Sequence, residues 1–491
     1  MRTSKEYIEK LDSMNQTVYM YGEKVKPTRD PRIRAGINVI SLTYDLPHDP
    51  RYEEVLTARS HLTGETINRF THVHQSTDDL VKKVNMTRLY CQQTGGCIQR
   101  CMGIDAMNAL SVVTYNMDQE LGTDYHKRFN DYLAYVQEND MTMNGAMTDV
   151  KGDRSLRPHQ QPDPDLYLHV VERQADGIIV KGAKAHNTAA PYAEDLIVMP
   201  TRAMVEEDAD YAVSFAIPAD APGIKLICRA TAPGDRPLFE KPLSSQWGVV
   251  DSMTIFDGVF VPWERVFMCG EWQYAGQLAA LFANYHRHSY TGCKPAMSDL
   301  LIGGTALIAE YNGVARASHI RQKLTDMIMV AEMVYACGMA ASMRGTQQPS
   351  GTYLPDTIYS NIGKYYAGTN LHHEYELAQD IAGGLLATMP SEKDYLSEET
   401  GEYLKKYLAG AAGVSVEQRI RCFRLLEDMT TSRYGAFMLV ASVHGGGSPE
   451  AERIAVLQNY DLESRKEMAR RLAGIVPTDL PSARFNAIDE E

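Results

Sequence analysis

The sequence predicts an α+β protein in which two helical regions flank a β-rich region. Helix-forming apolar patterns dominate residues 1–145 and 276–491, whereas residues 146–275 hold short runs of β-branched residues bounded by turn dipeptides. Strands and helices do not alternate along the chain, which argues against a doubly wound parallel sheet. We therefore expect an N-terminal helical domain, a middle β domain and a C-terminal helical bundle with these boundaries.

Composition places the chain among globular proteins. Of its 491 residues, 44% are hydrophobic and 23% are charged, which excludes a mainly disordered chain. The net charge of −14 argues against nucleic acid as a partner. The N-terminus lacks an apolar leader, and the run 434–443 is shorter than the roughly 20 residues of a membrane helix. We expect a cytoplasmic protein with no membrane partner.

Helices are expected first in the N-terminal region. Ser76 is a predicted helix cap, and Asp79 stands where its side chain reaches back to that cap. Helical patterns also cover residues 96–108 and 126–135.

The middle region carries a hairpin signal. The β-rich runs 165–172 and 178–184 are separated by Asp176-Gly177, a dipeptide typical of tight hairpin turns. Residues 211–217, 224–228 and 253–256 predict further strands, and the turn residues of 256–262 are expected to end this region.

The C-terminal region is again helical. Residues 303–343 are rich in helix formers, residues 345–355 predict a loop, and residues 449–472 predict one last helix. Gly292 and Pro295 are expected to disturb the helix around Cys293.

Cysteine and histidine spacing indicates a candidate metal site. Cys97 and Cys101 are four residues apart, which on a helix places both sulfur atoms on one face. His286, Tyr290 and Cys293 likewise share one helical face. A set of three cysteines and one histidine suits structural zinc or an iron–sulfur cluster. Cysteines that simply pack in the core are the alternative.

Other segments contain residues that can bind anionic ligands, but their patterns are less specific than that of the candidate metal site. Lys151 and Arg154 can pair with a pyrophosphate, but from these residues alone a polar loop that introduces the β domain is favoured. Residues 445–447 are three glycines that can hold a phosphate or form a tight turn, and the turn is favoured. Four basic residues can meet the phosphates of coenzyme A but are individually expected to be solvated surface charges: Lys82, Lys83, Arg88 and Lys294.

Several motifs in order carry a resemblance to a known family. They lie at residues 67–70, 74–80, 97–101, 145–154, 182–186, 285–294, 380–385, 388–392 and 444–449. With them the chain resembles the 4-hydroxyphenylacetate 3-hydroxylase-like flavoproteins, and within these the 4-hydroxybutyryl-CoA dehydratase/vinylacetyl-CoA delta-isomerase branch.

The resemblance implies a fold, an assembly and two cofactors. The fold is acyl-CoA dehydrogenase-like, the assembly is a homotetramer, and the cofactors are FAD and a [4Fe–4S] cluster. The implied cluster ligands are Cys97, Cys101, His286 and Cys293. The implied FAD-binding residues are Thr148, Asp149, Lys151, Asp153, Arg154 and Thr188.

The resemblance also implies a reaction on an acyl-CoA substrate. This is radical dehydration of 4-hydroxybutyryl-CoA, or a close hydroxyacyl-CoA, to crotonyl-CoA, together with vinylacetyl-CoA isomerisation. The implied catalytic residues are His286, Tyr290, Lys294 and Asp251. A flavin-dependent aromatic hydroxylase of the 4-hydroxyphenylacetate 3-monooxygenase type, which lacks the cluster, is the alternative, and a zinc-stabilised scaffold is a third.

Two positions depart from the family pattern. Ala441 stands where the family has a glutamate, and Asp251 stands where it has a second one. These departures leave the acyl group of the substrate open.

Overall fold

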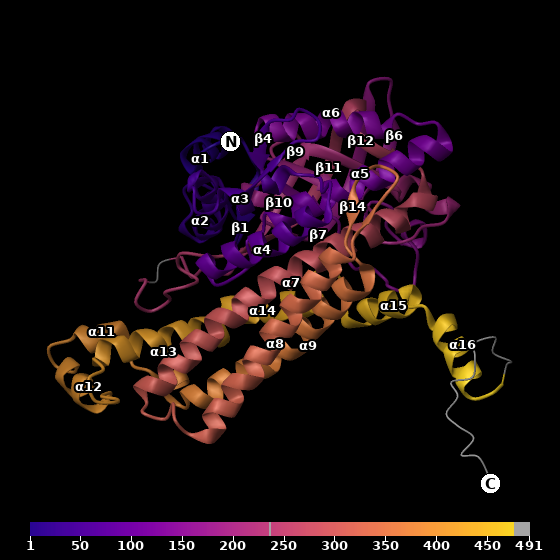
Figure 1. Cartoon of the computed structure of the whole chain (residues 1–491). Coiled ribbons are helices and arrows are strands. Elements are labelled where there is room, and N and C mark those ends of the chain that lie inside the picture. Colours follow the sequence, from indigo (N-terminus) through magenta and orange to yellow (C-terminus); the bar gives the residue numbers. More distant parts are fainter. Residues whose placement is uncertain (235–236, 476–491) are drawn as a thin grey trace, which may run out of the picture.

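A computed structural model describes residues 1–234 and 237–475 of the chain. Figure 1 shows N-terminal helices and strands packed together in the upper part of the view, with a bundle of long helices beneath them. The mixed α+β class predicted from the sequence is confirmed. The three predicted domain boundaries stay a prediction, and residues 476–491 of the third predicted domain lie outside the described residues.

The N-terminal region is mostly helical. Its helices are α1 (Ser4–Ser13), α2 (Pro31–Asp45), α3 (Glu53–Leu56), α4 (Thr77–Thr94), α5 (Cys101–Leu121) and α6 (Tyr125–Glu138). Helix α4 begins as predicted, because the Ser76 side chain accepts a hydrogen bond from the Asp79 backbone N–H. It ends at Gly95, whose φ of +67° is the left-handed conformation that favours glycine.

Two sheets lie between the helical regions. The larger has the order β2 (Glu23–Val25), β1 (Val18–Met20), β10 (Ile224–Ala230), β11 (Val250–Pro262), β7 (Gly177–Thr188) and β6 (His169–Arg173). The smaller has the order β12 (Val266–Cys269), β9 (Val213–Pro218), β8 (Asp195–Val198) and β5 (Met143–Ala146). Two short hairpins join β3 (Thr57–Arg59) to β4 (Thr66–Asn68) and β13 (Thr346–Gln347) to β14 (Tyr353–Leu354). Strand β1 was not predicted, and it pairs with β10 across the predicted boundary at residue 145.

The predicted hairpin is confirmed, but the end of the strand region is not where the turn residues placed it. Strands β6 and β7 pair antiparallel around Asp176. Residues 256–262 continue β11 instead of ending it, because a register shift between Phe256 and Val259 absorbs Asp257-Gly258 within the strand. Such a bulge bends a strand without stopping its pairing.

Long helices form the C-terminal bundle. They are α7 (Trp272–Tyr311), α8 (Ser318–Met343), α9 (Thr357–Ala382), α13 (Val416–Thr430), α14 (Arg433–His444), α15 (Pro449–Asn459) and α16 (Leu462–Leu472). Short helices α10 (Leu385–Thr388), α11 (Glu392–Leu396) and α12 (Gly401–Tyr407) lie between α9 and α13. The single helix predicted for residues 449–472 is wrong, because it divides into α15 and α16, and Asp461 caps the second.

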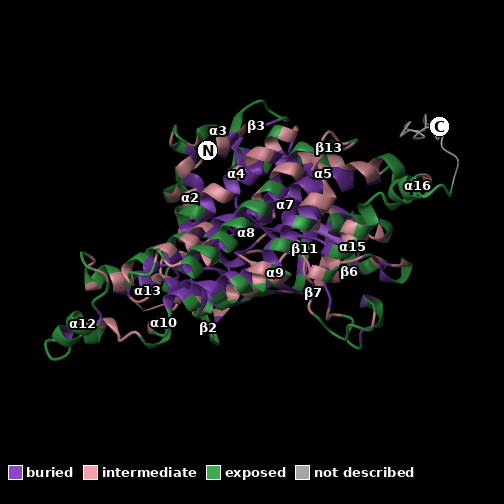
Figure 2. Cartoon of the chain, turned by 60° about the horizontal axis from the view of Figure 1, so that its bottom comes forward, coloured by how far each residue is buried: buried purple, intermediate pink, exposed green. Residues whose placement is uncertain are grey.

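Helix α7 runs unbroken through Gly292 and Pro295, so the predicted disturbance is wrong. Its central turns are buried between α4, α5, α8 and α9, and this packing outweighs the hydrogen bond that proline removes. Gly292 is required by close approach, because a Cβ there would lie 2.0 Å from Thr87 Oγ1 on α4. Figure 2 shows this central layer buried, with α12 and α16 exposed at the two ends.

Helix α8 is long and apolar enough to cross a membrane by length and composition. It packs against α7 and α9 within the bundle. Core helices of globular proteins meet the same criteria, and 39% of the apolar window of α8 is buried within the chain.

Candidate functional site

The first pair of predicted metal ligands lies at the start of α5. Cys101 is its first residue, but Cys97 lies in the preceding loop, because Gln99 has a φ of +67° that no helix continues through. The predicted shared helical face is therefore wrong, although the two thiols still hydrogen-bond to each other. The hydrogen bond from Cys101 and the positive charge of Lys294 lower the pKa of the Cys97 thiol to about 6.

Cys293 comes to these thiols from α7, together with a cysteine that the sequence analysis did not assign. Cys91 on α4 is fully buried and hydrogen-bonds to Cys293. Burial raises the pKa of the Cys91 thiol well above its usual value. The close contact of α4 and α7 at Gly292 brings these two sulfurs together. Spacing alone gives no signal for Cys91, because it precedes Cys97 by six residues, with the end of a helix between them.

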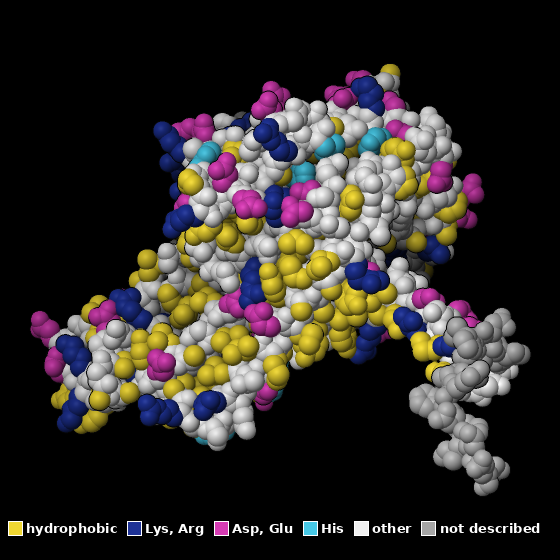
Figure 3. Space-filling view, in the orientation of Figure 1, with side chains coloured by type: hydrophobic (Ala, Val, Ile, Leu, Met, Phe, Trp, Pro, Cys, Tyr) yellow, Lys and Arg dark blue, Asp and Glu magenta, His cyan; other side chains and the backbone are white. Residues whose placement is uncertain are grey.

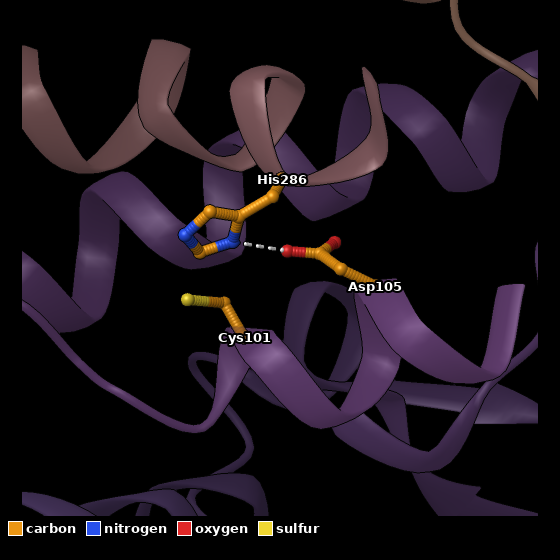
Figure 4. A group of neighbouring side chains, drawn as sticks. All are labelled: Cys101, Asp105 and His286. Atoms are coloured by element: carbon orange, nitrogen blue, oxygen red, sulfur yellow. Dashed lines mark hydrogen bonds and ion pairs between the residues drawn. The ribbon is translucent and has the colours of Figure 1, made fainter. Parts of the chain in front are cut away.

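His286 completes the group from α7, one turn before Tyr290. Its Nδ1 lies 2.8 Å from Asp105 Oδ2, and Cys101, Asp105 and His286 offer ligand atoms within 4.8 Å of one another. Figure 4 shows the second ring nitrogen at the far edge of the imidazole from Asp105, with the Cys101 sulfur below the ring. Side chains from α4 and α5 thus meet side chains from α7, which is distant in sequence.

The chemistry of the candidate donor atoms indicates which metal ion or cluster the site can bind. The three predicted cysteines are free, Cys101 and Cys293 are buried, and an imidazole lies beside them. Soft thiolate donors with one nitrogen suit an iron–sulfur cluster or zinc. The described residues fit both groups, and a purely apolar cysteine core does not explain the imidazole and carboxylate among the sulfurs.

Tyr290 and Lys294 extend the site along α7. The Tyr290 ring meets the His286 ring edge-on at 5.0 Å between centroids. Its hydroxyl donates to the Ala441 carbonyl oxygen over 3.2 Å, and burial raises its pKa well above the usual value. Two ammonium groups lie near the ring, Lys294 at 4.8 Å and Lys364 at 5.4 Å from its centroid. Ala441, one of the two positions that differ from the family pattern, therefore contacts the site residue Tyr290 directly.

The three glycines of residues 445–447 lie against side chains of α7. A Cβ on Gly445 would lie 1.8 Å from the Tyr290 hydroxyl, and one on Gly446 would lie 3.3 Å from His286 Cδ2. A Cβ on Gly447 would lie 2.5 Å from Arg287 Nη2. Close approach to the site, rather than a turn alone, explains why glycine is needed here.

Replacing Gly445 with alanine is expected to displace the Tyr290 hydroxyl and to lower any activity of this site by about 10-fold or more. Gly303, an exposed glycine within α7, is the matched control, because a Cβ there meets nothing within 4 Å. Steady-state kinetics and thermal unfolding of both variants measure the effect. Equal activity of the two variants would show that the close packing of Gly445 against Tyr290 does not affect activity.

Thr188 and Asp251 form a second centre at the neighbouring ends of β7 and β11. Thr188 Oγ1 donates to Asp251 Oδ1 over 2.6 Å, and burial raises the pKa of that carboxyl. Asn144 on β5 donates to the Thr188 carbonyl oxygen over 2.5 Å. His186 and Ala189, on either side of Thr188, have positive φ values of 56° and 70°. Such backbone strain concentrates at functional sites.

The loop that the resemblance implies for FAD pairs with β7, the strand that also carries Thr188. The Thr148 carbonyl oxygen accepts from the Ala185 N–H over 2.8 Å, and Asp149 pairs with Lys184 over 2.6 Å. Asp153 accepts from Ser155 over 2.7 Å.

Lys151 and Arg154 of this loop are exposed. Between them Gly152 has a φ of +53°. Asp149 is thus held by the protein, whereas these two cations face outward.

Gln99 and Tyr192 connect the two centres. Gln99 precedes Cys101 by two residues, and its side-chain oxygen accepts a hydrogen bond from the Tyr192 hydroxyl. That hydroxyl also accepts from the Val250 N–H, next to Asp251, over 3.2 Å. The loop that carries Cys97 is thereby tied to the strand that carries Asp251.

The interpretation of the four basic residues as solvated surface charges is wrong for two of them. Lys83 is fully buried and Lys294 is 5% exposed. Lys82 pairs with Asp78. Arg88 pairs with Asp299 and Glu332. Hydrophobic periodicity cannot reveal a buried lysine whose partner is distant in sequence.

Comparison with known proteins identifies relatives of the chain. The chain is 45% identical over 488 residues to 4-hydroxybutyryl-CoA dehydratase/vinylacetyl-CoA-Delta-isomerase of Clostridium aminobutyricum, with 97% of this chain and 100% of that one covered. It is 31% identical to the oxygenase component of 4-hydroxyphenylacetate 3-monooxygenase of Thermus thermophilus, with 96% of each chain covered.

Solved structures show the same relationship. An oxygen-tolerant archaeal 4-hydroxybutyryl-CoA dehydratase from N. maritimus matches with a TM-score of 0.93 and 43% identity, covering 97% of this chain and 96% of that one. The oxygenase component of 4-hydroxyphenylacetate 3-monooxygenase complexed with FAD matches with a TM-score of 0.87 and 29% identity, covering 96% and 98%. The 4-hydroxyphenylacetate 3-hydroxylase N-terminal and C-terminal family profiles match residues 3–268 and 275–474. The chain therefore belongs to the 4-hydroxyphenylacetate 3-hydroxylase family of enzymes and is most similar, among the relatives named here, to its 4-hydroxybutyryl-CoA dehydratase/isomerase members.

Proposed function

We propose that this enzyme is an FAD- and [4Fe–4S]-dependent dehydratase. It converts 4-hydroxybutyryl-CoA, or a close hydroxyacyl-CoA, to crotonyl-CoA and isomerises vinylacetyl-CoA. The observation that carries the proposal is that Cys101 and His286 offer ligand atoms within 4.8 Å of each other, in a buried cluster that also holds Cys293 and Tyr290. The similarity to the two dehydratases supports the substrate class.

Two sets of residues would hold the cofactors. The cluster ligands would be Cys97, Cys101, His286 and Cys293, and the FAD-binding residues would be Thr148, Asp149, Lys151, Asp153, Arg154 and Thr188. When bound, FAD supplies a transient one-electron oxidation that acidifies the substrate C3–H, and the cluster supplies a Lewis acid for the departing hydroxyl.

The side chains around the site have distinct roles in this proposal. His286 exchanges a proton with the substrate through Nε2 when that atom is not bound to metal, and the Tyr290 hydroxyl donates a hydrogen bond or proton to the departing oxygen. The Lys294 ammonium, held near the Tyr290 ring, neutralises charge on the substrate carbonyl. Asp251 is the proposed catalytic carboxylate next to the FAD, because it accepts a hydrogen bond from Thr188, a proposed FAD-binding residue.

Anaerobic assay tests the proposal directly. The protein is purified without oxygen, its iron, acid-labile sulfide and flavin are measured, and 4-hydroxybutyryl-CoA and vinylacetyl-CoA are supplied separately. Formation of crotonyl-CoA from both supports the proposal. NADH-linked oxygen consumption with a phenol selects the aromatic hydroxylase instead, and zinc without flavin selects the scaffold. Full cofactor content with neither substrate consumed overturns the proposed substrate.

Replacing Tyr290 with phenylalanine is expected to lower dehydration by about 100- to 10,000-fold, the usual contribution of a positioned acid or base. The ring and its contact with His286 remain, so flavin and iron content should be unchanged. Turnover of 4-hydroxybutyryl-CoA and cofactor analysis measure both. Wild-type turnover by this variant would remove Tyr290 from the mechanism.

The remaining expectations belong to the same proposal. They are an acyl-CoA dehydrogenase-like arrangement of the three predicted domains, a homotetramer and a cytoplasmic location. Figure 3 shows hydrophobic side chains gathered over the helical bundle. Exposed apolar residues of α8 include Ile328, Met329 and Met333. Contiguous apolar surface of this kind supports assembly with other subunits.

A further inference from the structure

A buried network surrounds the side of His286 that faces away from the sulfurs. Asp105 on α5 is fully buried and lies 2.8 Å from His286 Nδ1 and 2.5 Å from Lys83 Nζ. Ser289 Oγ donates to both of its oxygens over 3.0 Å. Lys83 is itself fixed, because its Nζ also donates to the Tyr285 carbonyl oxygen over 2.8 Å.

We infer that Asp105 is the positioning residue that makes Nε2 of His286 the metal-binding atom. The inference rests on the proposed function and assigns a role to a residue outside the predicted site. Asp105, paired with an ammonium, acts as an acceptor, so His286 Nδ1 carries the proton and donates it to Asp105. The lone pair then lies on Nε2, at the far edge of the ring (Figure 4). Metal-binding histidines are commonly fixed in this way by a carboxylate.

Packing fixes the plane of the same ring. Phe282 stacks against His286 at 5.6 Å between centroids with an interplanar angle of 9°, and Tyr290 meets it edge-on. With the ring held by these contacts and Nδ1 held by Asp105, rotation that would present Nδ1 to the sulfurs is excluded.

Asp105 is a poor metal ligand in its own right, although it lies within 4.8 Å of Cys101 and His286. Oδ1 already accepts from Lys83 and Ser289, and Oδ2 accepts from His286 and Ser289. A metal ion bound to Oδ1 would also lie beside the Lys83 ammonium, which repels it. The carboxylate thus acts through the histidine.

Asp105→Asn tests the inference because Lys83 dictates how the amide is oriented. The ammonium requires the amide oxygen, so the amide NH₂ faces His286 Nδ1 and moves the imidazole proton to Nε2. We expect the histidine ¹⁴N hyperfine coupling of the reduced cluster, measured by pulsed EPR, to be lost. Iron is expected to fall from about four to about three atoms per chain. Ser289→Ala is the matched control, because it removes a hydrogen bond to the same carboxylate but leaves the contact with His286.

The double variant Lys83→Met/Asp105→Asn should restore the coupling. Without the ammonium the amide is free to turn, and its oxygen accepts from His286 Nδ1 again. This variant also avoids the unpaired buried lysine that can prevent Asp105→Asn from folding. Retained coupling in the single variant, or its absence from a folded double variant, overturns the inference. Wild-type protein without iron overturns the proposed function instead, so the two failures are distinguishable.

Discussion

Replacing His286 with alanine is expected to lower dehydration of 4-hydroxybutyryl-CoA by about 1,000-fold or more while FAD remains bound. The change removes the only nitrogen donor of the predicted ligand set and its proton-exchanging group together. Thr188, which we propose binds FAD, keeps its hydrogen bond to Asp251, because neither of them hydrogen-bonds to His286. Anaerobic turnover, flavin absorbance and iron analysis measure the result.

His288, two residues further along α7, is the matched control. It is fully buried, and its Nε2 lies 2.8 Å from Ser342 Oγ, away from the ligand set. His288→Gln should keep the cluster and the histidine coupling. Equal losses of iron in both variants would mean that His286 acts only through the packing of α7.

Replacing Lys364 with methionine is expected to lower the free energy of unfolding by about 3–5 kcal/mol, the usual cost of breaking a buried ion pair. Lys364 Nζ lies 2.6 Å from Glu452 Oε1, and both side chains are fully buried between α9 and α15. The methionine leaves the carboxylate without its charge partner. Denaturant unfolding at neutral pH measures the loss.

The double variant Lys364→Met/Glu452→Leu separates charge from packing. It removes both charges, so most of the lost stability should return. In the single variant the loss should grow as pH rises, because burial raises the pKa of Glu452 and the folded state holds its proton longer than the unfolded state does. A pH-independent loss shared by both variants would show that the ion pair contributes little.

Local signals predicted local structure well. Ser76 and Asp79 mark the start of α4, and Asp176-Gly177 marks a hairpin, because each signal acts within a few residues of the backbone. The same reasoning was wrong at Pro295, where packing on all sides of α7 outweighs one lost hydrogen bond. It was also wrong at Cys97, because the left-handed Gln99 begins α5 four residues later than the spacing predicts.

The sequence by itself determined the order of helical and β regions, since this follows from residue type and periodicity, and it supplied the candidate sulfur and nitrogen donors, whose role as metal ligands stays a prediction. Only the tertiary structure decided which groups surround those donors: Asp105 and Lys83 behind His286, and Cys91 beside Cys293. The reason is physical. Spacing fixes neighbours within one helix or strand, whereas these contacts depend on how closely α4, α5 and α7 approach. Gly292 sets part of that approach by lacking a Cβ.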